Sequence, residues 1–179
     1  SNGLVEKNKI NNIEKTSGAT ISGITLASSA TASNIKIYNN FISNIRANGN
    51  NNSTTGGSGL RIVSGNGYKI YHNTINLSVM GNNYSNQMLT SAVYIINGTS
   101  LDIKNNIFVN TQIGGSIYAI YSVNNATFST LNYNNYFASI QGNISLGANS
   151  KNVNPTFITS SNLKLQEIST NEALKSGTP

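Results

Sequence analysis

Carboxylates are the side chains with which many enzymes cleave glycosidic bonds, and this chain of 179 residues has only five of them. They are Glu6, Glu14, Asp102, Glu167 and Glu172. Hydrolysis with inversion needs two carboxyl groups roughly 6.5–9.5 Å apart, and no acidic residue lies near Asp102 in the sequence. A calcium site needs a cluster of oxygen ligands. The sequence therefore predicts no catalytic carboxylate pair, no metal site and no bound cofactor.

Nitrogen bases offer a second kind of chemistry. The chain has no Cys, and His72 is its single histidine, so a transition-metal site of histidine and thiolate ligands is not expected. A lysine base, with an arginine to neutralise a sugar carboxylate, is the arrangement of a polysaccharide lyase. The candidates are Arg61, Lys36 and Lys69. We expect Arg61 to lie on a different face of the fold from both lysines, which disfavours a lyase, and His72 to be a turn residue.

The elements that must position these residues repeat along the chain. Similar phrases occur at residues 39–42 (NNFI), 72–75 (HNTI) and 105–108 (NNIF). The recurring Asn residues are Asn8, Asn40, Asn73, Asn106 and Asn135, spaced by 32, 33, 33 and 29 residues. A fixed period in this range is typical of stacked repeat proteins. Within a repeat, residues 59–63, 68–71 and 74–77 alternate with period two, which indicates three short strands joined by turns.

We therefore predict an all-β fold, a parallel β-helix with about five coils of three short strands, whose equivalent strands stack at about 4.8 Å. The recurring Asn would form a ladder of amide hydrogen bonds and would accept the left-handed backbone of a tight turn. The expected inward columns are Ile10, Ile42, Ile75, Phe108 and Phe137, and Ile37, Ile70 and Ile103. The shorter last spacing predicts a distorted last coil, or a register that differs there by one residue.

Outward side chains of the same strands form columns that could bind a ligand. The expected columns are Thr25, Arg61, Tyr94 and Tyr121; Leu4, Lys36, Lys69 and Asp102; and Glu6, Tyr38, Tyr71, Lys104 and Tyr133. Stacked tyrosines beside basic groups make an amphipathic face suited to sugar rings. The predicted binding residues are Tyr38, Tyr71, Tyr94, Tyr121, Arg61, Lys36 and Lys69. The alternative is that the tyrosine columns only stabilise the sheets.

Three segments rich in Asn, Ser and Gly, residues 46–58, 78–91 and 111–117, separate one coil from the next. They occupy equivalent places in the repeat, so we expect them to project from one edge of the stack. Such segments are either binding loops or a solvated fringe.

The repeated phrase and its Asn resemble the right-handed parallel β-helix family of the pectate lyases, over roughly residues 4–140. The closing phrases NPTF (154–157), NLKL (162–165) and SGTP (176–179) are similar to the ends of large Asn- and Ser-rich surface proteins of Bacteroidota. The resemblance implies a right-handed β-helix and an extracellular or cell-surface location in bacteria. Residues 1–150 would form the coils, the first one incomplete. Residues 151–179 would form a C-terminal cap or linker that covers one end with Phe157, Leu163 and Leu165.

The expected role is that of a rigid stalk or adhesive module that binds a polysaccharide or cell-surface glycan. The alternatives are a polysaccharide lyase whose catalytic coils lie mostly outside this segment, and a repeat without a ligand. The rest of a longer parent chain would cover the first coil. The formal charge of +6 comes from 11 scattered basic residues, so no nucleic-acid partner is expected. No apolar run approaches ~20 residues, so we expect no membrane insertion.

Overall fold

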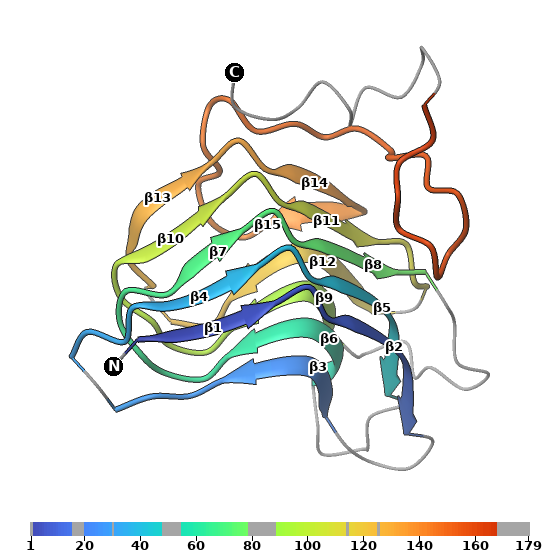
Figure 1. Cartoon of the computed structure of the whole chain (residues 1–179). Helices are drawn as coiled ribbons and strands as arrows, with labels where there is room; N and C mark the ends of the chain where they lie inside the picture. Colours follow the sequence, from blue (N-terminus) through green and yellow to red (C-terminus); the bar gives the residue numbers. More distant parts are fainter. Residues whose placement is uncertain are drawn as a thin grey trace.

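The computed structural model describes residues 2–15, 20–29, 31–47, 55–78, 89–113, 115–124 and 126–167. These residues form a parallel β-solenoid with three sheets of five strands each (Figure 1). Every strand pairs in parallel with the strand three places further along the chain. The chain therefore completes about four turns between β1 and β13 and then adds β14 and β15. The predicted all-β coiled architecture is confirmed.

Each turn contributes one strand to each sheet. The first sheet holds β1 (Gly3–Glu6), β4 (Ile35–Tyr38), β7 (Lys69–Tyr71), β10 (Leu101–Lys104) and β13 (Phe128–Asn132). The second sheet holds β2 (Lys9–Lys15), β5 (Phe41–Ala47), β8 (Thr74–Leu77), β11 (Ile107–Asn110) and β14 (Asn135–Ala138). The third sheet holds β3 (Ile21–Leu26), β6 (Thr55–Ile62), β9 (Leu89–Ile95), β12 (Ser116–Ser122) and β15 (Ile140–Gly142). Residues 48–54 and 79–88, the greater part of two expected loops, lie outside the described residues.

The core lies between the three sheets and includes most of the predicted inward columns. Ile37, Ile70 and Ile103 are aligned by strand pairing and almost fully buried. The second sheet aligns Ile10, Ile42, Ile75 and Phe108. The fifth member of that column is Tyr136 and not the predicted Phe137, because Tyr136 is the residue paired with Phe108.

The third sheet contributes small residues where it faces the large side chains of the second sheet. The strand register aligns Gly23, Gly59, Ala92 and Ala119 on neighbouring strands. A Cβ atom on Gly59 would lie 2.2 Å from Cγ2 of Ile75 and 2.9 Å from the carbonyl oxygen of Ala92. Glycine at residue 59 therefore lets the two sheets approach each other closely.

The recurring Asn residues form the predicted ladder at the turn between the first and second sheets. Asn8, Asn40 and Asn73 each donate from the backbone N–H and from Nδ2 to Oδ1 of the equivalent Asn one coil further on, at 2.8–3.1 Å. Nδ2 of Asn73 also donates to the carbonyl oxygens of Ile37 and Tyr71. Each central Asn of the ladder thus supplies hydrogen bonds to several buried polar groups from one side chain, which explains the constant spacing.

The last rung of the ladder is Asn134 and not the predicted Asn135. Asn106 donates to Oδ1 of Asn134 at 3.0 and 2.9 Å, whereas Asn135 is the Cα partner of Ile107. Beyond the register shift between Leu101 and Asp102, β10 pairs with β13 at an offset of 28 residues, the same offset that separates Asn106 from Asn134 and pairs β11 with β14. Of the two expectations for the last coil, the shift by one residue is the one observed.

The left-handed backbone of the turn lies one residue before the ladder, contrary to the prediction. These residues have φ between 53° and 57°: Lys7, Asn39, His72, Asn105 and Tyr133. The ladder Asn keeps an ordinary backbone so that its side chain points inward. The preceding residue points away from the core and can therefore vary. His72 is a turn residue, as predicted, and Tyr133 belongs to the turn rather than to an outward column.

The C-terminal segment covers the last coil at its edge and then runs along the side of the stack. Lys151 continues the second sheet, since its N–H donates to the carbonyl of Asn134 and its carbonyl accepts from Tyr136. Ile144 and Leu146 pack against the core. Leu163 and Leu165 instead lie beside the outward residues Phe41, Thr74 and Ile107 of the second sheet. The prediction that both leucines cover the end of the stack is therefore wrong. Residues 168–179 lie outside the described residues.

Candidate functional site

The outward columns of the first sheet are those expected from the sequence, except at the last position of one column. Leu4, Lys36, Lys69 and Asp102 follow one another on paired strands. The neighbouring column is Glu6, Tyr38, Tyr71 and Lys104, and its next member is Asn132 where the sequence predicted Tyr133. The strand pairing thus places Lys36 and Lys69 on adjacent strands of one face.

Tyr71 is held by its neighbours on this face. Its hydroxyl donates a hydrogen bond to Oδ2 of Asp102, and Nζ of Lys104 lies 4.9 Å from the centre of its ring. Lys104 also forms an ion pair with Asp102 at 3.9 Å. Burial raises the pKa of the Tyr71 hydroxyl above its ordinary value, and the hydrogen bond to the Asp102 carboxylate and its charge add to the shift. The side chain of Tyr71 is therefore already engaged in contacts that stabilise the sheet, and it is less available to a ligand.

The raised pKa of Tyr71 predicts a loss of stability in alkali. Above pH about 10, the unfolded tyrosine releases its proton while the folded one retains it. The contribution of this group to stability is thus complete below that pH and is lost as the pH rises through the folded pKa. Chemical denaturation at pH about 9 and about 11 should show a smaller loss for Tyr71→Phe than for the wild type. Equal losses would indicate that the contact with Asp102 does not form.

Tyr38 is the most exposed of the four predicted binding tyrosines, with 37% of its surface accessible to solvent. Its ring contacts His72 edge to face, with ring centres 5.3 Å apart and an interplanar angle of 76°. The exposed face of Tyr38 is a single aromatic surface beside an exposed turn residue.

The third sheet carries a more continuous row of planar groups. The strand pairing aligns Arg61, Tyr94 and Tyr121. Cζ of Arg61 lies 5.7 Å from the centre of the Tyr94 ring, and the rings of Tyr94 and Tyr121 stack with centres 5.7 Å apart and an interplanar angle of 16°. We call Arg61, Tyr94 and Tyr121 the aromatic row.

Two details set the aromatic row apart from a simple strand-stabilising column. Nε of Arg61 is buried and has no hydrogen-bond partner among the described residues, although a buried charged donor usually has one. Burial raises the pKa of Tyr94, opposed by the charge of Arg61 and assisted by Tyr121. The row is therefore partly shielded from water and retains an unused donor.

Tyr118 extends this row and was missed at the level of sequence. Its ring centre lies 4.8 Å from that of Tyr121, with an interplanar angle of 57°. The residue directly follows the segment 111–117, which the sequence analysis assigned to an irregular connection. Strand β12 already begins at Ser116, and the apolar and aromatic run from residue 117 to residue 121 is the signal that could have found Tyr118.

The structure does not bring all the predicted binding residues together. Arg61, Tyr94 and Tyr121 lie on the third sheet, while Lys36, Lys69, Tyr38 and Tyr71 lie on the first. These are two separate faces, as the sequence analysis expected for Arg61 and the lysines. A lysine base and an arginine from these residues therefore do not share one site.

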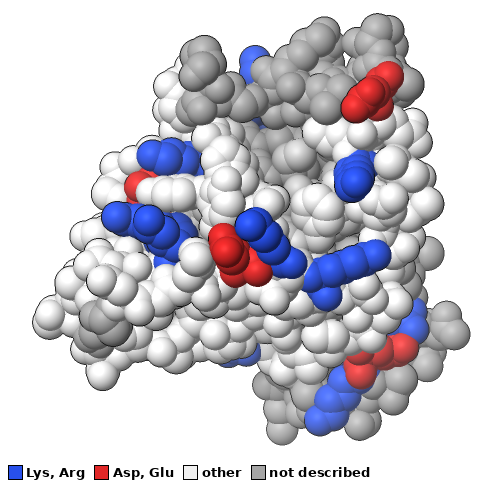
Figure 2. Space-filling model, viewed as in Figure 1, with Lys and Arg blue, Asp and Glu red and all other residues white. Residues whose placement is uncertain are grey.

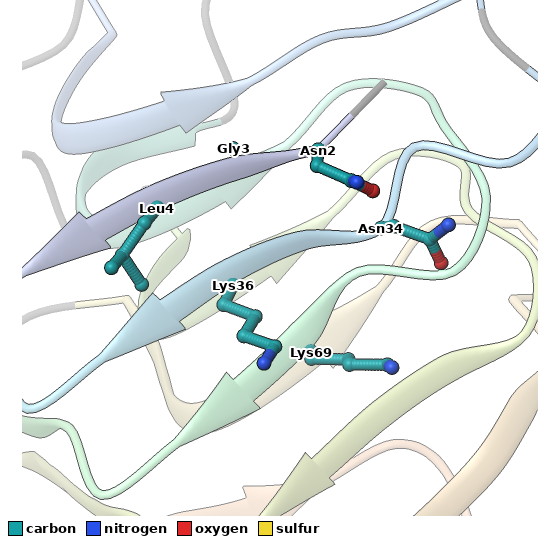
Figure 3. Close-up of a pocket in the computed structure, with 6 residues that line it drawn as sticks. All are labelled: Asn2, Gly3, Leu4, Asn34, Lys36 and Lys69. Carbon is teal, nitrogen blue, oxygen red and sulfur yellow. The ribbon is translucent and has the colours of Figure 1, made fainter.

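Among the hollows on the surface of the described part of the chain, two lie beside predicted functional residues. One, of about 570 Å³, is lined by Asn2, Gly3, Leu4, Asn34, Lys36 and Lys69 (Figure 3). The other, of about 370 Å³, lies between the C-terminal segment and the second sheet and includes His72 and Glu167. Among the same described residues, no three His, Cys, Asp or Glu side chains gather as a metal site would require. Nor do these residues include a helix long and apolar enough to cross a membrane.

Comparisons with protein families, with curated proteins and with solved structures find no match to this chain. The assignment of the fold therefore depends on the strand pairing and the Asn ladder, and any function must be argued from the surfaces themselves.

Proposed function

We propose that this chain is a rigid module of a secreted or surface-attached bacterial protein, and that it binds a polysaccharide or cell-surface glycan through the aromatic row. The observation that carries the proposal is Arg61, whose partly buried guanidinium lies over Tyr94 and whose Nε has no hydrogen-bond partner among the described residues. A sugar ring offers apolar C–H faces to aromatic rings and hydroxyl oxygens to such a donor.

The β-solenoid suits a stalk or an adhesive module. Its outward residues are held at the separation of neighbouring strands, about 4.8 Å, by backbone pairing and by the buried Asn ladder. Little side-chain or loop ordering is then needed when a ligand binds, and a preorganised surface loses less free energy on association.

The resemblance to the right-handed β-helices of the pectate lyases supports an extracellular carbohydrate ligand and remains part of this proposal. The ladder occupies the turn between the first and second sheets, in line with that resemblance. A lyase activity has no comparable support, because Arg61 and the two lysines occupy different sheets.

We further infer that the open edge formed by β1, β2 and β3 can accept an additional coil. Within the described residues, β1, β2 and β3 are each paired on one side only. Asn8 donates to Asn40 and is itself exposed, so its Oδ1 could accept the corresponding hydrogen bonds from an Asn of an added coil. Leu4, on β1, is 57% exposed. Adding one consensus coil before residue 1 should raise the melting temperature; an unchanged or lower value would contradict this inference.

Binding of glycans tests the main proposal. Calorimetric titration with neutral and acidic polysaccharides should detect binding to the wild type, and replacing both Tyr94 and Tyr121 with Ala should weaken it by about tenfold or more, since each aromatic contact contributes about 1 kcal/mol. Tyr38→Ala, on the first sheet, is the matched control and should leave the affinity for neutral polysaccharides unchanged.

Two outcomes would overturn the proposal. Unchanged affinity in the Tyr94→Ala, Tyr121→Ala variant would exclude the aromatic row as the binding surface. Release of unsaturated sugars during the titration would instead show that the protein is a lyase.

A further inference from the structure

The first sheet has a hollow of about 570 Å³ near β1 that is distinct from the aromatic row. Lys36 on β4 and Lys69 on β7 are Cα partners, and Leu4 on β1 is the partner of Lys36. Figure 3 shows the side chains of Leu4, Lys36 and Lys69 projecting from the same face of these strands, with Asn2 and Asn34 near the strand starts. The hollow thus combines two ammonium groups, two amides and one aliphatic side chain.

The two lysines carry like charges on directly paired positions, which is destabilising for a sheet. Neither lysine forms an ion pair within the described part of the chain. The ion pairs of the described residues are Arg46 with Glu14 and Lys104 with Asp102. Asp102 is the Cα partner of Lys69 on β10, but its Oδ2 binds Tyr71 and Lys104, and its buried Oδ1 has no hydrogen-bond partner among the described residues. Figure 2 shows basic side chains gathered on this face.

We propose that this hollow binds an acidic sugar residue, whose carboxylate or sulfate lies between the ammonium groups of Lys36 and Lys69. The amides of Asn2 and Asn34 then face the sugar hydroxyls, and Leu4 packs against the apolar face of the ring. Like charges on paired strands are tolerated because a bound anion neutralises both. This inference rests on the proposed glycan-binding function and names its substrate class, an acidic polysaccharide.

A glycan fits this hollow better than a nucleic acid. Nucleic-acid binding relies on many basic contacts to phosphates, or on stacking of bases on aromatic side chains. The hollow supplies two basic groups and no aromatic ring. Its amides and its leucine match the hydroxyls and C–H groups of a sugar.

The test compares two variants with the same loss of charge. Lys36→Gln with Lys69→Gln removes the proposed site, and Lys9→Gln with Lys164→Gln removes two exposed positive charges elsewhere. Calorimetry at about 0.15 M salt, where long-range attraction is screened, would use oligogalacturonate, sulfated dextran, neutral dextran and a single-stranded DNA oligonucleotide. Thermal melting of each variant checks that it is folded; glutamine retains most of the lysine stem.

The first variant is expected to bind the acidic oligosaccharide about tenfold or more weakly, as for the loss of charge-assisted contacts, and the second variant within about twofold of the wild type. Preference for oligogalacturonate or for sulfated dextran identifies the acidic group. Equal losses in the two variants, no loss in the first, or tighter binding of DNA would overturn the inference.

The same titrations separate this inference from the proposed function. Binding of neutral dextran that depends on Tyr94 and Tyr121, without any preference for acidic ligands, would overturn the lysine site and leave the aromatic row. Binding of acidic ligands that depends on Lys36 and Lys69, but not on the tyrosines, would overturn the aromatic row and leave the lysine site.

Discussion

Replacing Asn73 with Leu is expected to lower the free energy of unfolding by about 3–5 kcal/mol. Asn73 lies in the middle of the ladder and is 2% exposed. It accepts hydrogen bonds from the backbone N–H and Nδ2 of Asn40 and donates to Asn106, Ile37 and Tyr71. Leucine has a similar volume but can make none of these side-chain hydrogen bonds, so their partners are left unpaired. Each buried polar group left unpaired costs about 1–3 kcal/mol.

Urea denaturation of the wild type and the variant would measure this loss. Asn152→Leu is the matched control, because Asn152 is exposed and lies outside the ladder, and a surface substitution usually changes stability by no more than about 0.5 kcal/mol. If Asn73→Leu unfolded at the same urea concentration as the control, the ladder amides would have to be hydrated in solution rather than bonded to one another.

Replacing Gly59 with Ala is expected to destabilise the protein by about 2–3 kcal/mol through overpacking. The added methyl group would lie 2.2 Å from Cγ2 of Ile75, a residue that is fully buried, and 2.9 Å from the backbone oxygen of Ala92. One neighbour is a core side chain on β8 and the other is backbone of β9, so the first cannot move without disturbing the core, nor the second without disturbing the pairing of β6 with β9. Denaturation curves would report the change directly.

A double-mutant cycle would locate the cause of this destabilisation. Ile75→Ala alone should cost about 2–5 kcal/mol by leaving a cavity, and combining it with Gly59→Ala should cost less than the sum, because the new methyl group enters that cavity. Gly3→Ala is the control, since the three atoms nearest to its Cβ would all belong to the Ile35 side chain, the first at 3.3 Å. Additive effects in the cycle would mean that the clash with Ile75 does not limit the approach of the two sheets.

The sequence by itself determined the repeat, the three-strand coil and most of the side-chain columns. Period-two alternation can be seen within a single strand. The constant spacing then assigns the same inward and outward positions to the equivalent strand of the next coil. The ladder from Asn8 to Asn106 and the inward column of Ile37, Ile70 and Ile103 could therefore be predicted from residue types and spacing. The positions of Lys36 and Lys69 on one face, and of Arg61 on another, followed from the same alternation.

Only the tertiary structure decided the details that depend on contacts between elements. Asn134 rather than Asn135 completes the ladder because β10 pairs with β13, and β11 with β14, at an offset of 28 residues, which places Asn134 opposite Asn106. The same packing places Leu163 and Leu165 against the second sheet instead of the end of the stack. Tyr71 turns toward Asp102 and Lys104 because their side chains meet across neighbouring strands. Register shifts and rotamers depend on the free energy of these distant contacts, which the order of residues along one strand does not contain.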